Sequence, residues 1–249
     1  MGQITELAKM IDHSLLHPTM TDKDLFEGCQ LAKAYNVATV CIKPYAIKEA
    51  LEWLKGSDVM VCAVIGFPQG NSTTGVKVYE TEQACKDGAQ EIDMVVNIGK
   101  VLGEDWDYVE KEIWAIVAVT KKHHAALKVI FENDFLPDDK YKIKLCGICS
   151  AAGVEFVKTS TGYGFAKGAD GKYSYEGATE HDLILMRKHS APGSTDQSCR
   201  RRTYTGRPAQ SKSPGRYARW RHGYRGYAGR SEETLWQRGW FDAICGECG

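Results

Sequence analysis

The sequence has no excess of charge of either sign and no long apolar run. Its 249 residues include 32 basic and 32 acidic side chains, so the formal net charge at pH 7 is zero. Proteins that bind a polyanion or an acidic membrane surface usually carry a basic excess, so this balance argues against both partners. No stretch approaches the roughly 18 consecutive apolar residues of a transmembrane helix. We therefore expect a soluble globular protein with neither a nucleic-acid nor a membrane partner.

The sequence also shows neither the pattern of a signal peptide nor that of a disulfide framework. The first residues have no basic region followed by an apolar core, so they do not predict a signal peptide. The nine cysteines are odd in number and scattered through apolar segments, which favours free thiols over a disulfide framework. Both observations predict a cytoplasmic protein.

Short apolar runs alternate along the chain with amphipathic helical patterns. The apolar runs predict six strands, at residues 8–16, 38–44, 59–67, 91–98, 126–133 and 154–161. The helical patterns lie at residues 21–36, 46–56, 76–89, 105–123, 138–153 and 179–189. Thr21 with Asp24, and Thr179 with Asp182, have the spacing of helix-capping pairs. Near-continuous apolar strands separated by helices are typical of a parallel sheet covered by helices.

The number of these units predicts the fold class. Six βα units at a spacing of roughly 30 residues, with room for two more, fit an α/β protein of the (β/α)8 TIM-barrel type. We assign residues 1–192 to the barrel domain, which includes the first six βα units and the start of the seventh. A doubly wound open sheet is the alternative. It is disfavoured because no Gly-x-Gly-x-x-Gly follows the first strand.

Four charged residues interrupt the apolar runs: Asp12, Asp93, Lys128 and Lys158. Any one of them alone can be a satisfied polar residue in a strand. Four at inward-facing positions favour a catalytic site, because barrel enzymes carry their chemistry at the C-terminal ends of the strands. Burial, or a second cation nearby, lowers the pKa of a lysine, so that its neutral amine can attack a carbonyl and form a Schiff base. A neighbouring carboxylate can then move protons as the imine becomes an enamine.

At these residues the sequence resembles the 2-deoxyribose-5-phosphate aldolases, which are class I aldolases on a (β/α) barrel. The matching words run in order over residues 4–190: IDHSLL, VCIKP, VIGFPQGNSTTGVKVYET, GAQEIDMVVNIG, LKVIFEN and FVKTSTGYG. The resemblance implies cleavage of 2-deoxy-D-ribose 5-phosphate to D-glyceraldehyde 3-phosphate and acetaldehyde. It implies Lys158 as the Schiff-base lysine and Asp93 as the proton donor and acceptor. We expect no metal, no organic cofactor and a homo-oligomer; a Schiff-base lyase acting on another sugar phosphate is the alternative.

Four further residues are predicted to bind substrate: Asp12, Cys41, Lys128 and Thr161. Lys128 either supports Asp93 or the substrate electrostatically, or forms a purely structural ion pair with that aspartate. Cys41 is either a thiol reactive toward aldehydes or, as the more ordinary interpretation, a buried core residue. Thr161 follows Lys158 and offers a hydroxyl at the mouth of the pocket.

The pattern changes near residue 193. Residues 1–192 contain twenty lysines and one arginine, whereas residues 193–249 contain one lysine and ten arginines. The second segment has no valine, and Leu235 and Ile244 are its only branched aliphatic residues. A seventh and an eighth barrel strand cannot be built from this composition. The resemblance implies a word of the form VKAAGGVRTL here, with a second lysine and then a phosphate site, and neither is present.

A shifted reading frame explains this segment. With suitable codons, residues 196–205 (DQSCRRRTYT) read one base later permit IKAAGGVRTL, and the codon of the second lysine straddles Gln197 and Ser198. We hypothesise that the gene or the recorded sequence is out of frame from about residue 193. If the polypeptide does end as written, we expect severely reduced activity.

Two other interpretations of the segment remain open. Arginines interleaved with tyrosine and tryptophan in RYARWRHGYRGYAGR could bind RNA, so that the chain would be an inactive barrel remnant with an RNA-binding tail. Cys146 and Cys149 could join Cys245 and Cys248 in a zinc site. The first cysteine pair, however, lies in a helical pattern where positions i and i+3 face the core.

Overall fold

The computed structural model describes residues 7–168 and 170–191. Its main sheet has six strands, and each one corresponds to a strand expected from the sequence. They are β1 (Asp12–Leu15), β2 (Thr39–Ile42), β3 (Met60–Ile65), β4 (Glu91–Val95), β5 (Ala126–Ile130) and β6 (Phe156–Lys158). All neighbouring pairs are parallel, and the strands follow one another in the order of the sequence.

This strand order confirms the predicted barrel class. A doubly wound sheet reverses its strand order at a switch point, and the described sheet has no such reversal. The sheet is curled, because the ammonium of Lys128 on β5 lies 2.7 Å from the carboxylate of Asp12 on β1, four strands away. Among the described residues β1 and β6 each pair on one side only. The arginine-rich segment 193–249, which stands where a barrel would have its last two βα units, lies outside the described residues, and so do Cys245 and Cys248 of the hypothetical zinc site.

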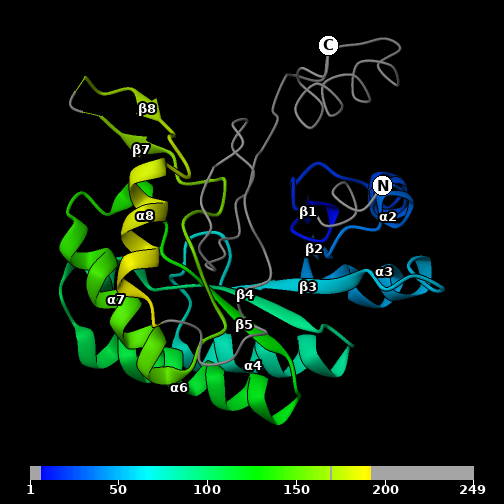
Figure 1. Ribbon diagram of the computed structural model, residues 1–249, viewed down its shortest axis with the longest axis horizontal. Helices are drawn as coiled ribbons and strands as arrows, with labels where there is room; N and C mark the ends of the chain where they lie inside the picture. The colour runs from blue at the N-terminus through cyan, green and yellow to red at the C-terminus, as the bar shows by residue number, and fades with distance from the viewer. Residues whose placement is uncertain (1–6, 169, 192–249) are drawn as a thin grey trace.

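Helices follow the strands and cover the outer face of the sheet. They are α2 (Asp22–Tyr35), α3 (Ile47–Trp53), α4 (Thr74–Lys86), α5 (Ile98–Leu102), α6 (Trp106–Lys122), α7 (Asp139–Ala152) and α8 (Glu180–His189), with short 3₁₀ turns η1 (Pro44–Ala46) and η2 (Asn133–Phe135). Figure 1 shows α4, α6, α7 and α8 as one succession along the sheet. The hydroxyls of Thr21 and Thr179 accept the predicted N-terminal capping bonds. None of the described helices is long and apolar enough to cross a membrane.

Helix α5 and the strands β7 (Ala166–Lys167) and β8 (Tyr173–Ser174) were not expected from the sequence. Helix α5 is a single short turn that Asn97 caps by accepting a hydrogen bond from the amide of Lys100. Strands β7 and β8 form a small antiparallel hairpin, which Figure 1 shows beyond α8 and apart from the main sheet. Two-residue strands give no measurable alternation, so a sequence pattern cannot reveal them.

The two faces of the sheet carry different side chains. The outer face packs Val, Ile, Leu and Met side chains against the helices, and Cys146 and Cys149 of α7 belong to this core, as their spacing predicted. The inner face carries a smaller apolar cluster, built on Leu16, Cys41, Cys62 and Val64. The charged side chains of Asp12, Asp93, Lys128 and Lys158 are buried on the same face, so the inner face brings buried charges together.

A buried ion pair outside the barrel fixes the end of β4. Lys77 of α4 and Glu112 of α6 are fully buried and lie 2.9 Å apart. The Lys77 ammonium also donates to the carbonyl of Val95 (2.8 Å), and the amide of Asn97 donates to Glu112 (3.2 Å). Burial lowers the pKa of Lys77 and raises that of Glu112, while each partner opposes the shift of the other. These bonds connect the helical layer to the backbone two residues beyond Asp93.

Candidate active site

The four charged residues singled out in the sequence lie together on the inner face of the sheet. Asp12, Asp93, Lys128 and Lys158 come from β1, β4, β5 and β6, and their side chains form one continuous network of ion pairs. The side chains of Asp93 and Lys128 are fully buried, and those of the other two are at most 3% exposed. Charges removed from water persist only when they are paired, so this network must be satisfied internally.

Lys158 is the last residue of β6. Its ammonium donates to Oδ2 of Asp93, and its carbonyl accepts a hydrogen bond from the amide of Phe131 (2.9 Å). The backbone pairing thus continues past the end of β5 and fixes the direction in which the amine points. The amine must release its proton before it can attack a carbonyl, and the Asp93 carboxylate is in direct contact with it.

Lys128 is the shared cationic partner of three carboxylates. Its ammonium lies 2.7 Å from Asp12, 2.6 Å from Glu91 and 3.2 Å from Asp93. Burial acts to lower the pKa of Lys128, but the carboxylates, led by Asp12 and Asp93, outweigh it and hold that pKa well above its ordinary value. This shift favours the charged form of Lys128, which is an ion-pair partner of Asp93. Electrostatic support of the substrate stays a prediction for this residue.

Asp93 occupies the centre of the network. Burial alone would raise its pKa, but the ammonium groups of Lys128 and Lys158 outweigh this and hold the pKa of the carboxyl below its ordinary value. The thiol of Cys62 lies 3.0 Å from Oδ1, and that of Cys41 lies 3.6 Å from Oδ2. Asp93 is thus an anionic acceptor that touches the amine of Lys158, which is the arrangement needed for proton transfer next to a Schiff base.

Cys41 is fully buried on β2, with its thiol directed toward Asp93 on the inner face of the sheet. Its side chain has no exposed surface, and burial raises the pKa of its thiol. Thiol reactivity depends on the thiolate, so this environment suppresses it. The geometry agrees with the predicted core interpretation, and contact with substrate stays a prediction for this residue.

Within residues 7–168 and 170–191, two groups of residues have donor atoms close enough to hold a metal ion. Cys41, Cys62 and Asp93 form one of them. Two ammonium groups contact its only carboxylate, and burial raises the pKa of both thiols, so this group is poorly suited to bind a metal cation.

The second group is Asp139, His181 and Asp182, on α7 and α8. Lys142 already supplies a cation there, because its ammonium lies 3.0 Å from Asp139 and 2.6 Å from Asp182.

Thr161 lies in the loop that follows β6, three residues after Lys158. The residue is buried, its hydroxyl donates to Glu132, and its amide lies 3.2 Å from each oxygen of the same carboxylate. Thr161 is thus next to the ion-pair network, while the proton of its hydroxyl is directed to Glu132. Its predicted role in substrate binding remains a prediction.

The sequence interpretation missed several polar residues of the site. Glu91 contacts Lys128, Cys62 contacts Asp93, and Thr39 donates to Asp12 (2.6 Å). Glu91 could have been predicted from the sequence, since it lies two residues before Asp93 and the alternation of side chains places both on one face of the strand. Cys62 gave no such signal, because its proximity to Asp93 depends on the register between β3 and β4.

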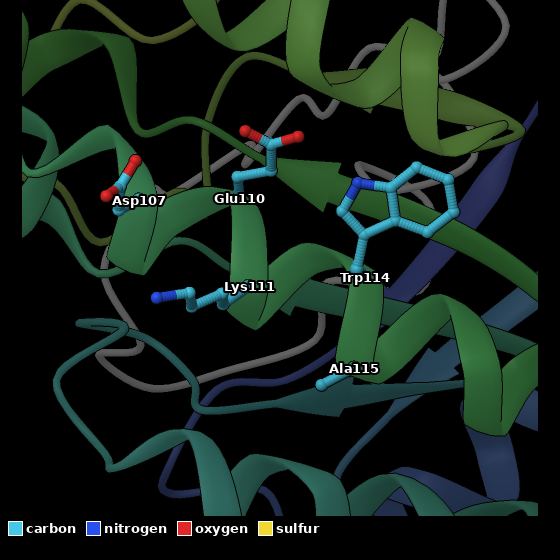
Figure 2. A pocket seen from close by; sticks show the side chains of 5 residues that line it. All are labelled: Asp107, Glu110, Lys111, Trp114 and Ala115. Carbon is cyan, nitrogen blue, oxygen red and sulfur yellow. The ribbon is translucent and has the colours of Figure 1, made fainter.

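The surface of α6 carries an open depression that is separate from this site. Its lining residues are Asp107, Glu110, Lys111, Trp114 and Ala115. Figure 2 shows that all five side chains extend from consecutive turns of the one helix. None of the residues of the ion-pair network lines it, so the reactive groups and this depression are unrelated.

Comparison with known proteins agrees with the geometry. The sequence pattern of the DeoC/LacD family aldolases matches residues 7–189. A deoxyribose-phosphate aldolase from Rhodopirellula baltica is 49% identical over 188 residues, which cover 76% of this chain and 73% of the relative. One from Clostridium perfringens is 44% identical over 187 residues, covering 75% and 78%. A structure described as the tetrameric deoxyribose phosphate aldolase from Aeropyrum pernix superposes with a TM-score of 0.66 at 29% identity, covering 77% and 76%.

Proposed function

The chain belongs to the DeoC/LacD family of aldolases, and on this basis we propose that it cleaves 2-deoxy-D-ribose 5-phosphate into D-glyceraldehyde 3-phosphate and acetaldehyde. The observation that carries the assignment is the buried contact between the amine of Lys158 and the carboxylate of Asp93. A Schiff-base aldolase needs one nucleophilic lysine and one adjacent proton carrier, and this pair supplies both.

Lys158 acts as the nucleophile. Its neutral amine adds to the aldehyde carbon of the open-chain sugar, and the adduct loses water to give an iminium ion. Removal of the proton from the C3 hydroxyl then breaks the bond between C2 and C3. The bonding electrons pass into an enamine, and glyceraldehyde 3-phosphate leaves. Protonation of the enamine carbon and addition of water release acetaldehyde and regenerate the amine, so the water lost at first is regained.

Asp93 carries the protons of these steps. In the resting site its carboxylate contacts the Lys158 amine directly and is anionic because Lys128 and Lys158 favour its charged form, so it is ready to accept a proton. A water molecule between this carboxylate and the substrate would relay the proton from the C3 hydroxyl and return it to the enamine carbon. Lys128 offsets part of the negative charge of Asp12, Glu91 and Asp93.

We also propose an oligomeric state and a cytoplasmic location for this chain. The relative from Aeropyrum pernix is described as a tetramer, and we infer that this chain forms a homo-oligomer as well. The six cysteines of the described residues are all free thiols, which is the state expected in a reducing cytoplasm.

The reading-frame hypothesis bears directly on activity. We propose that the segment from about residue 193 is read out of frame, so that the chain as written lacks the second lysine and the phosphate site that the family resemblance implies. Sequencing the gene and measuring the intact mass distinguish the cases: an uninterrupted frame together with the full 27.7 kDa chain would refute the hypothesis. Salt-dependent retention on a nucleic-acid column would instead support an RNA-binding tail.

A product assay tests the proposed function. The chain as written and the chain with its frame restored are incubated with 2-deoxyribose 5-phosphate and with other sugar phosphates, and both products are measured. Lys158→Arg is the matched control, because arginine keeps the positive charge beside Asp93 but forms no Schiff base. We expect turnover of the deoxyribose ester by the restored chain and none by its Lys158→Arg variant. Equal turnover of another sugar phosphate would overturn the substrate assignment.

A further inference from the structure

Glu132 is a buried carboxylate that the mechanism above leaves without a role. It lies just after β5, next to the ion-pair network, and only 1% of the residue is exposed. Its backbone adopts a left-handed conformation (φ 57°), which residues with a Cβ atom rarely take. A buried acid held in a disfavoured conformation at the carboxyl end of a barrel strand requires an explanation from its contacts.

The carboxylate of Glu132 faces the loop that follows Lys158. Both of its oxygens lie 3.2 Å from the amide nitrogen of Thr161, and the hydroxyl of Thr161 donates to Oε2. The same hydroxyl accepts a hydrogen bond from the amide of Tyr163 (2.9 Å). Gly164 packs so closely that an added Cβ would lie 2.7 Å from the carboxylate. One side chain therefore fixes residues 161–164.

The backbone on either side of Glu132 is tied to the same loop. The amide of Phe131 donates to the carbonyl of Lys158, and that of Asn133 donates to the carbonyl of Thr159, each at 2.9 Å. These two bonds extend the pairing of β5 with β6 past the end of both strands. The left-handed turn at Glu132 lies between them, so its carboxylate reaches the next residues of the loop, where the strand pairing ends.

The bonds to Glu132 also decide what Thr161 can offer to a ligand. A hydroxyl has one proton and two lone pairs. In Thr161 the proton goes to Glu132 and one lone pair accepts from Tyr163, which leaves one lone pair. In this arrangement the hydroxyl can accept a hydrogen bond from a substrate hydroxyl, but it has no proton to donate to a phosphate oxygen.

We propose that Glu132 is a positioning residue of the aldolase site: it fixes the loop behind Lys158 and orients the Thr161 hydroxyl as an acceptor for a hydroxyl of the substrate. The part that concerns substrate rests on the proposed function, whereas the part that concerns the loop does not. Glu132 acts through Thr161 and Lys158 and makes no contact with the reacting atoms in this proposal.

Hydrogen exchange of the full chain tests the loop. Glu132→Ala removes the acceptor, and we expect the amides of Thr161 and Tyr163 to exchange about tenfold faster, the effect of losing roughly one net hydrogen bond. Glu132→Gln keeps one acceptor oxygen and is expected to restore most of the protection. Asp134→Asn is the matched control, since Asp134 holds the amides of Glu176 and Gly177 in the same manner. Unchanged exchange at Thr161 in Glu132→Ala would overturn the proposal.

A second readout separates positioning from a structural role. In the frame-restored chain, borohydride trapping of the Schiff base on Lys158 is expected to be at least about tenfold slower in Glu132→Ala and to recover in Glu132→Gln, while Asp134→Asn stays at the parent rate. If the loop amides of Glu132→Ala exchange faster but its Schiff base is trapped at the parent rate, the positioning role is wrong. Failure of the parent to trap at all contradicts the proposed function alone, because the exchange experiment still tests the loop.

Discussion

The pH dependence of folding gives a sharp test of the buried Glu132. Burial raises the pKa of this carboxyl from an ordinary 4.5 to about 7, although its hydrogen bonds from Thr161 act in the opposite direction. The folded protein therefore binds a proton at pH values where the unfolded chain has already released it. The stability from this group is fully present below about pH 4.5, and it is lost as the pH rises through about 7.

The size of the effect follows from the two pKa values. The difference between 4.5 and about 7 corresponds to about 3 kcal/mol of unfolding free energy. Glu132→Gln has no titrating group at this position, so its stability lacks this loss. We expect the variant to gain up to about 3 kcal/mol relative to the parent between about pH 5 and pH 8.

Urea denaturation of both proteins at several pH values across that range measures this gain. The constant difference between the two side chains cancels, because only the change with pH is compared. Asp134→Asn serves as a control for the loss of a neighbouring carboxylate. If the parent and Glu132→Gln have parallel pH profiles, the carboxyl is not buried as described and the reasoning fails.

Three further predictions concern the ion pairs. Lys128→Met leaves its carboxylate partners buried without their cation and should cost about 3–5 kcal/mol in unfolding free energy by urea denaturation. That deficit should shrink at low pH as the carboxylates protonate, and a deficit independent of pH would count against this cause. Asp93→Asn should lower kcat about 10²–10⁴-fold in the frame-restored chain, whereas a normal rate would remove this residue from proton transfer. Lys77→Met should destabilise by about 3–5 kcal/mol, and adding Glu112→Leu should recover much of the loss in a double-mutant cycle; strictly additive losses would show that the pair is not coupled.

Much of the barrel could be predicted because local rules and tertiary structure agree. The apolar runs became β1 to β6, and the amphipathic patterns between them became the covering helices. The capping threonines Thr21 and Thr179 mark true helix starts. Lys128 and Lys158 could be recognised because a lysine inside an apolar run has to face either a partner or a reactive site.

The remainder of the site depends on information that a single sequence does not contain. The role of Glu132 arises from a left-handed turn, and the word FEN has no glycine to indicate it. The contact between Cys62 and Asp93 arises from the register of neighbouring strands. The buried pair of Lys77 and Glu112 joins two helices that are far apart in the sequence, and amphipathic patterns do not give the pairing of particular side chains.

The described sheet also gives the reading-frame hypothesis its structural context. Six strands are in sequence order, and among the described residues the edges of the sheet are β1 and β6. A barrel of eight strands needs two more between these edges. The word IKAAGGVRTL, which suitable codons permit in the shifted frame, would fall at the point in the chain where the first of them is expected.

Each step of the proposed mechanism depends on a covalent bond between the Lys158 amine and the substrate. Borohydride reduction in the presence of 2-deoxyribose 5-phosphate, followed by peptide mapping of the frame-restored chain, tests this directly. We expect a reduced adduct on the peptide that contains Lys158, with Lys128 unmodified. An adduct on Lys128 alone, or none on Lys158 while the enzyme still releases acetaldehyde, would contradict it.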